Sequence, residues 1–221
     1  MEDLTYEQQA HDAGYALVCG VDEAGAGPLM GPVYAAAVIL PEKFELPGLN
    51  DSKKLTEKKR EALFPRIQQQ ALAWSVASVS AREIDETDIL SARMKAMQLA
   101  IDGLTPRPDF ALIDGNRDHG KSAAVTTPHR CIVGGDAHAA SIAAASILAK
   151  VSRDRYVTDV LDKRYPEYQF ARHKGYGTKL HYEMLDKFGP CAEHRISFLK
   201  KWSLNKQMSN TCHLKAQNVY K

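Results

Sequence analysis

The chain has 221 residues, 44% hydrophobic and 25% charged, which is the composition of an ordinary globular protein with one main domain. No apolar run approaches the roughly 20 residues of a membrane helix, and the polar start Met1–Ala10 lacks the regions of a signal peptide, so we expect a cytoplasmic protein. Residues 1–149 carry 14 basic and 20 acidic side chains (net −6), whereas residues 150–221 carry 15 basic and 7 acidic ones (net +8). The C-terminal third is therefore a candidate surface for binding a polyanion such as a nucleic acid.

Short apolar runs alternate with helix-like segments along the chain. This alternation is typical of an α/β domain built around a sheet. The strands that we expect are Ala16–Val21, Val33–Leu40, Trp74–Ser80, Phe110–Ile113 and Cys131–Val133.

The first two predicted helices lie between these strands. Thr56 is a suitable cap for a helix that begins at Glu57. Pro65 removes a hydrogen bond and clashes with the preceding turn, so we expect a kink or a break at Phe64. Apolar residues at roughly helical spacing predict one further helix over Ile84–Ile101.

The remaining helices fall in the last third of the chain. The Ala- and Ser-rich segment Ala137–Val151 predicts a helix that can pack its backbone closely against a sheet. Tyr156–Leu161 and Leu180–Phe188 follow as helices, separated by a loop over Pro166–Gly177. We expect one domain over residues 1–202, and a basic tail over residues 203–221 that is disordered or ordered only by a partner.

Three of the strand-like runs end in acidic residues. Asp22 and Glu23 follow the first run, Asp114 ends the fourth, and Asp136 follows the fifth. Sites form at strand ends in α/β sheets, so these acids can converge. Hard divalent cations relieve the repulsion within such a cluster. The pattern therefore predicts a magnesium or manganese site, and two such ions assist in-line hydrolysis of a phosphodiester.

Each acid also has a purely structural interpretation. Asp136 precedes a helix and is a candidate N-cap, while Asp114 before glycine suits a turn. Asp22 and Glu23 are harder to explain in this way, because the glycines that follow them let the backbone approach a ligand. Regular pleating sends their two side chains to opposite faces, so both join one cluster only if the strand twists or ends there.

The four cysteines are scattered rather than paired, which favours reduced thiols over a disulfide framework. The spacing of Cys191 and His194 provides half of a zinc site, but no second pair is spaced to complete it. We therefore favour ordinary thiols over zinc ligands.

Several longer motifs follow one another in a characteristic order. They are Gly20–Pro28, Leu49–Leu55, Leu112–Asn116, Gly135–Asp136, Ser141–Asp154 and His173–Thr178. With these motifs the chain resembles ribonuclease HII, the bacterial type 2 ribonuclease H, over most of its length but not in the tail. The resemblance implies a ribonuclease H-like fold, with a mixed central sheet flanked by helices and a helical C-terminal portion that helps to hold the nucleic acid.

The resemblance also implies the site residues. In this family four acids bind two catalytic ions, Mn²⁺ or Mg²⁺, and here they are Asp22, Glu23, Asp114 and Asp136. A Gly-Arg-Gly segment and a tyrosine recognise the junction where a ribonucleotide is followed by DNA. These map to Gly25-Ala26-Gly27 and to Tyr176, so the arginine is absent. Without the resemblance, we would favour a loop tyrosine packed on the core as the interpretation of Tyr176.

Other basic and polar residues are candidate substrate contacts. Lys53, Lys54 and Lys174 are candidate phosphate contacts, although any one of them is also explained as a solvated side chain. Ser52 is a candidate contact too, but a turn and cap is the favoured explanation of Asp51-Ser52.

By resemblance, we expect a monomeric endonuclease that cuts on the 5′ side of a ribonucleotide in an RNA/DNA hybrid or in DNA, leaving a 3′-hydroxyl and a 5′-phosphate. Single embedded ribonucleotides, and thus ribonucleotide excision repair, are the expected target. One alternative is a protein that binds hybrids without cutting, which Ala26 favours and the four acids oppose. Another is a different two-metal enzyme, an exonuclease or phosphatase, which the Gly-Tyr-Gly loop and the basic C-terminal third oppose.

Overall fold

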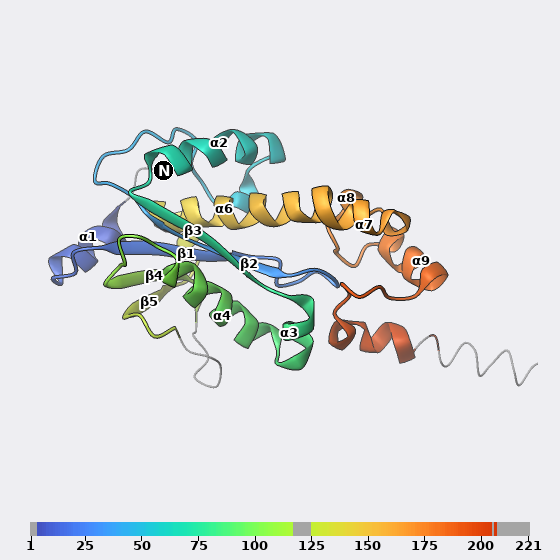
Figure 1. Ribbon diagram of the computed structural model, residues 1–221. Coiled ribbons are helices and arrows are strands. Elements are labelled where there is room, and N and C mark those ends of the chain that lie inside the picture. The colour runs from blue at the N-terminus through green and yellow to red at the C-terminus, as the bar shows by residue number, and fades with distance from the viewer. Residues whose placement is uncertain (1–3, 117–124, 205, 207–221) are drawn as a thin grey trace, which may run out of the picture.

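The computed structural model describes residues 4–116, 125–204 and 206, and these residues contain a five-stranded mixed sheet (Figure 1). The strands are β1 (Val18–Ala24), β2 (Val33–Ile39), β3 (Ala73–Val79), β4 (Phe110–Asp114) and β5 (His129–Ile132), in the order β3-β2-β1-β4-β5. The β1–β2 and β2–β3 pairs are antiparallel, whereas β1–β4 and β4–β5 are parallel. All five predicted strands are confirmed, but β1 does not end at Val21 and continues through both acids to Ala24.

Two long helices cover the two faces of the sheet (Figure 1). Helix α4 (Ile89–Asp102) packs Met97 in the same core as Val21, while α6 (Ala140–Tyr156) packs its alanines in a second core that contains Ala36. A Cβ atom at Gly20 would lie 2.2 Å from the backbone carbon of Ser141. The glycine and the Ala-rich helix together allow this close approach, as the composition predicts.

Two of the helix predictions are wrong in detail. Instead of one helix over Ile84–Ile101, α3 (Ala81–Glu86) and α4 are separate. The reason is capping: Ser80 and Glu83 form a capping box on α3, and the Asp88 carboxylate accepts hydrogen bonds from two amides in the first turn of α4.

Helix α2 (Glu57–Gln70) is capped by Thr56, as predicted, but it runs through Pro65 without a break at Phe64. The lost hydrogen bond is offset by burial of Leu63, Phe64 and Ile67 against the core that includes α6.

The remaining elements are short or lie near the chain ends. Helix α1 (Thr5–Asp12) was not predicted, and α5 (Gly135–His138) is separate from α6. A π-helical turn (Val157–Leu161) and α7 (Asp162–Arg164) continue α6, and α9 (Lys179–Phe188) lies close to its predicted place. The predicted loop at 166–177 contains η3 (Pro166–Tyr168) and α8 (Phe170–His173), and two other 3₁₀ turns are η1 (Ser52–Lys54) and η4 (Ile196–Leu199).

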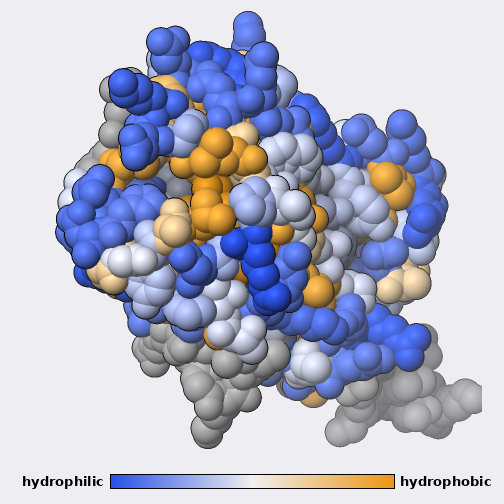
Figure 2. All heavy atoms as spheres, turned by 60° about the vertical axis from the view of Figure 1, so that its left-hand side comes forward, coloured by the Kyte–Doolittle hydropathy of each residue, from blue (hydrophilic) through white to orange (hydrophobic). Residues whose placement is uncertain are grey.

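Figure 2 shows one face on which hydrophilic residues predominate around a smaller apolar patch. None of the helices among the described residues has the length and apolar character to cross a membrane. Apart from Ser203, Leu204 and Lys206, the predicted basic tail lies outside the described residues.

Candidate active site

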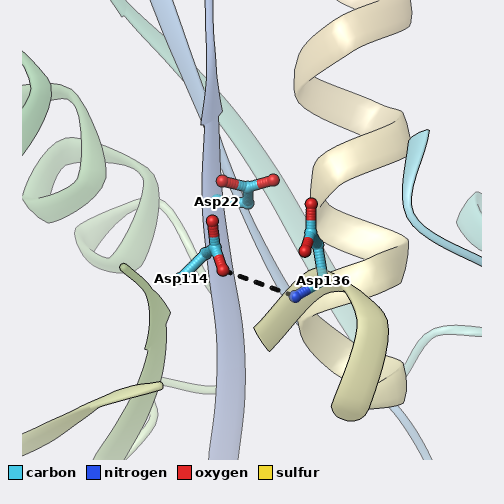
Figure 3. Close-up of side chains that lie close together, drawn as sticks. All are labelled: Asp22, Asp114 and Asp136. Carbon is cyan, nitrogen blue, oxygen red and sulfur yellow. Dashed lines mark hydrogen bonds between the residues drawn. The ribbon is translucent and has the colours of Figure 1, made fainter. Parts of the chain in front are cut away.

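Three aspartates from three different elements meet beside β1 (Figure 3). Asp22 is on β1, Asp114 ends the parallel neighbour β4, and Asp136 is on α5, which follows β5. One carboxylate oxygen of each lies within 4.8 Å of the others. The Asp136 amide also donates to the Asp114 carboxylate over 3.4 Å. The parallel pairing of β1, β4 and β5 is therefore what brings these acids together.

The N-cap interpretation of Asp136 is wrong. The cap position of α5 is Gly134, which has a left-handed backbone, and Asp136 lies inside the helix with its side chain directed at the other aspartates. Asp114 precedes Gly115, whose φ of 124° suits a turn, so its place at a turn and its place in the cluster are compatible.

The cluster carries more negative charge than its surroundings compensate. Burial raises the pKa of Asp22 well above its usual range, and the neighbouring Glu23 and Asp114 raise it further. Burial also raises the pKa of Asp114 and of Asp136. The Lys53 ammonium lies 3.2 Å from the Asp136 carboxylate, but its side chain is 75% exposed. Oxygen ligands with unbalanced charge form the type of site that a hard divalent cation binds.

Glu23 lies beside the three aspartates but is bound differently. The pleat of β1 directs it towards α4, where its Oε1 atom lies 2.6 Å from Nη2 of Arg93. Its Oε2 atom is buried and has no hydrogen-bond partner among the described residues. The structure thus brings three of the four predicted acids into one cluster and leaves the fourth next to it with one free oxygen.

A cavity of about 220 Å³ joins the acids to most of the predicted substrate contacts. Its lining consists of Asp22, Glu23, Ala24, Gly25, Ala26, Gly27, Ser52, Lys53, Asp114, Lys150 and Tyr176. The Tyr176 side chain is 43% exposed rather than packed in the core. The cavity therefore places the glycine loop, two lysines and an accessible aromatic ring next to Asp22, Glu23 and Asp114.

One predicted contact, Ser52, is buried in the cavity wall, and two others, Lys54 and Lys174, lie outside the lining. Ser52 lines the cavity but is buried, and its hydroxyl accepts a hydrogen bond from Ser146 at 2.6 Å. Lys54 is exposed outside the cavity lining. The Lys174 ammonium donates to the Thr158 hydroxyl at 2.7 Å, also outside that lining.

Lys150 also lines the cavity, although it was not among the predicted contacts. Its ammonium is 5.8 Å from the centre of the Tyr176 ring and 2.9 Å from the Asp154 carboxylate. Arg93 was also missed. Each of these residues acquires its role from a partner on another element or another turn, so its own position in the sequence gave little signal.

Two buried histidines are linked by hydrogen bonds to each other and to Tyr176. His194 accepts from the Cys191 amide through Nδ1, and its Nε2 atom lies 3.0 Å from Nε2 of His181. The His181 Nδ1 atom in turn lies 3.0 Å from the Tyr176 carbonyl oxygen. Protein groups therefore engage both ring nitrogens of His194.

These histidines predict a loss of stability in mild acid. Burial lowers the pKa of His181 and of His194 to about 4, and repulsion from His173 lowers the pKa of His181 further, as repulsion from His181 does for His194. A lowered pKa means stability that is present above the unfolded value near 6.5 and is lost as the pH falls towards 4. Each pKa unit corresponds to about 1.4 kcal/mol, or roughly 3–5 °C in melting temperature for a chain of this size.

Thermal unfolding between pH 7.5 and pH 4.5 measures this effect. We expect the melting temperature of His194→Gln to fall less steeply with decreasing pH than that of the parent. Substitution of the exposed His11 by Gln should leave this slope unchanged. Equal slopes for the parent and His194→Gln would show that the buried pair is not the cause.

Comparisons with known proteins identify a family and several similar chains. A family model described as Ribonuclease HII matches residues 19–203. Ribonuclease HII of Caldicellulosiruptor bescii is 52% identical over 202 residues, which cover 90% of this chain and 96% of that protein. Ribonuclease HII of Aliivibrio fischeri is 55% identical over 185 residues, covering 84% and 87% of the two chains. The crystal structure of ribonuclease H2 from Pyrococcus horikoshii OT3 is similar with a TM-score of 0.68 and 27% identity, over 84% of this chain and 96% of that one.

Proposed function

The chain belongs to the ribonuclease HII family, and we propose that it cuts on the 5′ side of a ribonucleotide, including a single ribonucleotide embedded in DNA. Enzymes of this family are hydrolytic endoribonucleases that act on the RNA strand of RNA/DNA hybrids. The proposed products carry a 3′-hydroxyl and a 5′-phosphate. The observation that carries the proposal is that Asp22, Asp114, Gly25–Gly27 and Tyr176 line one cavity.

We propose that two divalent cations, Mn²⁺ or Mg²⁺, are held by Asp22, Asp114 and Asp136, with Glu23 as the fourth acid. The all-carboxylate donor set, the raised pKa values of the aspartates and the free Oε2 atom of Glu23 support this assignment. When bound, such cations lower the pKa of water and stabilise negative charge on a phosphodiester. Glu23 would bind a cation through its Oε2 atom, while its Oε1 atom stays paired with Arg93.

The other residues that line the cavity would recognise the substrate. A Cβ atom at Gly27 would lie 3.9 Å from the Tyr176 ring, so the glycine loop and the tyrosine face each other closely enough to contact one sugar. A 2′-hydroxyl is the group that distinguishes RNA from DNA at a given nucleotide. We assign phosphate contacts to Lys53 and Lys150 within the cavity and to Lys54 and Lys174 outside it, with Ser52 as a further substrate contact.

One experiment tests this function directly. A duplex with a single ribonucleotide, labelled at one end, is incubated with the protein and Mn²⁺, Mg²⁺ or EDTA, and an all-DNA duplex of the same sequence is the control. We expect one cut, 5′ to the ribonucleotide, with either metal and none with EDTA or in the control. Binding without cutting would favour the binding-only alternative, and release of nucleotides from the ends would favour an exonuclease. We propose that the protein acts as a monomeric repair enzyme in the cytoplasm.

The basic C-terminal third predicts a strong dependence of binding on salt. Its exposed cations include Lys179 and Lys187, whereas Arg153 and Arg195 are fully buried and cannot contact phosphate. If about five cations reach phosphates, counterion release lowers the affinity by roughly 10²–10³-fold between 50 and 200 mM salt.

The salt dependence is measured with a fluorescent hybrid in calcium across a salt series. We expect Lys179→Gln to reduce the logarithmic slope by about one, because one phosphate contact is lost. Lys43→Gln removes an exposed lysine from the acidic part of the chain and should leave the slope unchanged. A salt-independent affinity would contradict the assignment of this surface.

A further inference from the structure

We infer that two adjacent buried residues, His194 and Arg195, are positioning residues for ribonucleotide recognition. Arg195 holds the glycine loop (residues 25–28), and His194 holds the tyrosine loop (residues 175–177) through His181. This inference rests on the proposed function, since it assigns substrate contacts to the two loops. Neither residue lines the cavity, so both act through the loops and not on the substrate itself.

Arg195 binds the glycine loop through backbone carbonyl groups. Its guanidinium donates to the carbonyl oxygens of Gly25 at 2.7 Å, Ala26 at 3.1 Å and Pro28 at 2.8 Å. A fourth hydrogen bond, of 2.9 Å, reaches Gly31 just after the loop. In a planar trans peptide the N–H points opposite to the C=O, so the amides of residues 26 and 27 point away from the guanidinium. One side chain thus fixes the orientation of successive peptide groups in the loop.

The charge of Arg195 adds to this effect. The side chain is fully buried, and among the described residues its charge is met by carbonyl dipoles and not by an ion pair with a carboxylate. Burial lowers its pKa to about 9, so the group stays protonated at neutral pH. A fixed cation behind the loop favours negative charge in front of it, where a phosphate of the substrate would lie. This cation is present whichever side chain occupies position 26.

His194 acts on the tyrosine loop through a chain of hydrogen bonds whose direction is determined. Because the Cys191 amide donates to its Nδ1 atom, the ring proton must be on Nε2, from which it is donated to His181. His181 then carries its proton on Nδ1 and donates it to the carbonyl of Tyr176. The two rings are 0% and 3% exposed, so water does not replace either partner. The tautomers follow from these partners.

The backbone joins the two loops to the same segment. The Gly31 amide donates to the Glu193 carbonyl at 2.8 Å, and the Arg195 amide donates to the Leu29 carbonyl at 2.9 Å. The Leu29 amide donates to the Gly175 carbonyl at 2.8 Å, which ties the glycine loop to the tyrosine loop. A Cβ atom at Gly25 would lie 2.1 Å from the Arg153 side chain, so the glycine is required for this packing. Residues 193–195 therefore connect both loops in a single unit.

The test uses His194→Gln, Tyr176→Ala and their double variant, with His11→Gln as a matched control on the surface. If His194 acts through Tyr176, His194→Gln lowers kcat/KM on a single-ribonucleotide duplex by roughly ten- to a hundred-fold. In the Tyr176→Ala background the same substitution should then change kcat/KM less than about two-fold. A purely structural role predicts instead that the two effects multiply, and this outcome would overturn the inference for His194.

Arg195→Lys tests the other half of the inference. Lysine keeps the charge but lacks the planar fork, so it cannot hold these carbonyls together. We expect kcat/KM on the single-ribonucleotide duplex to fall by roughly ten- to a hundred-fold, while the affinity for an all-DNA duplex in calcium stays within about two-fold. Arg164→Lys, at an exposed arginine, is the control. Equal losses on the two duplexes would overturn the role of Arg195 in ribonucleotide recognition.

Amide hydrogen exchange separates this inference from the proposed function, because it requires no turnover. Exchange in residues 25–31 should quicken in Arg195→Lys and exchange in residues 174–178 should quicken in His194→Gln, while β4 stays protected in both. Unchanged exchange in these segments would overturn the positioning roles even if the parent cleaves. A parent that fails to cleave but shows the expected exchange would reject the proposed function while leaving the positioning intact.

Discussion

Replacing Asp22 by Asn is expected to lower cleavage by roughly 10³-fold or more, to the background of the assay, while hybrid binding in calcium survives. Asp22 lies at the centre of the carboxylate cluster and is 3% exposed, so no water-mediated contact can easily substitute for it. Loss of one carboxylate weakens cation placement, whereas the phosphate contacts lie on other side chains. Asp114→Asn should have the same effect. Single-turnover cleavage and fluorescence anisotropy measure the two properties separately.

The fold of the variant is checked independently. Asparagine has nearly the shape of aspartate, and its side-chain oxygen can still accept the 2.7 Å hydrogen bond from the Glu23 amide. Because burial and like charges disfavour ionised Asp22, the metal-free variant should melt at or above the temperature of the metal-free parent. Asp159→Asn changes the net charge equally at an exposed position and serves as the control. Near-normal turnover by the Asp22 variant would remove this residue from the metal site.

The strands were predictable because each is an apolar run bounded by turn residues, but the end of β1 was not. The apolar run ends at Val21, so the predicted strand ended there, before the two acids. In the structure Asp22 pairs with Ala36 and Glu23 pairs with Ala35 on β2, so the strand continues through both. Arg93 on α4 compensates the charge of Glu23, and this long-range contact cannot be read from the neighbouring sequence.

The ends of α3 and α4 were also not predicted from the sequence. The residue types of the capping box, Ser80 and Glu83, are present in the sequence, but the apolar spacing across Asp88 favoured one long helix. Local capping competed with periodicity, and capping prevailed.

The site itself divides into a predictable and an unpredictable part. Acids at strand ends and glycines beside them are recognisable by type and position, and the structure gathers most of them around one cavity. Arg195 is different, because its guanidinium contacts a carbonyl 170 positions earlier in the chain. Nothing in its local sequence distinguishes it from the exposed cations of the basic C-terminal third. A buried positioning residue is found only when the packing is known.

The second large expected effect is that of a substitution at Ala26, in the glycine loop. This residue is half-buried in the cavity lining, and Arg195 holds its carbonyl at 3.1 Å. The backbone path of the loop therefore does not depend on the side chain at position 26. A longer side chain can be introduced here without disturbing the contacts that orient the loop.

Ala26→Arg is expected to raise kcat/KM on a single-ribonucleotide duplex by about ten- to a hundred-fold, with manganese and magnesium alike. The physical reason is one charge-assisted hydrogen bond to a phosphate, worth roughly 1.5–3 kcal/mol. Ala26→Met supplies similar length without charge and should give no gain, while Ala26→Lys supplies charge without the fork and should give less than arginine. Rates over a range of substrate concentrations separate tighter binding from a faster chemical step. If Ala26→Arg cuts no better than the parent, then Lys53 and Lys150, which already line the cavity, supply the cation that arginine would add, and Ala26 is not a functional loss.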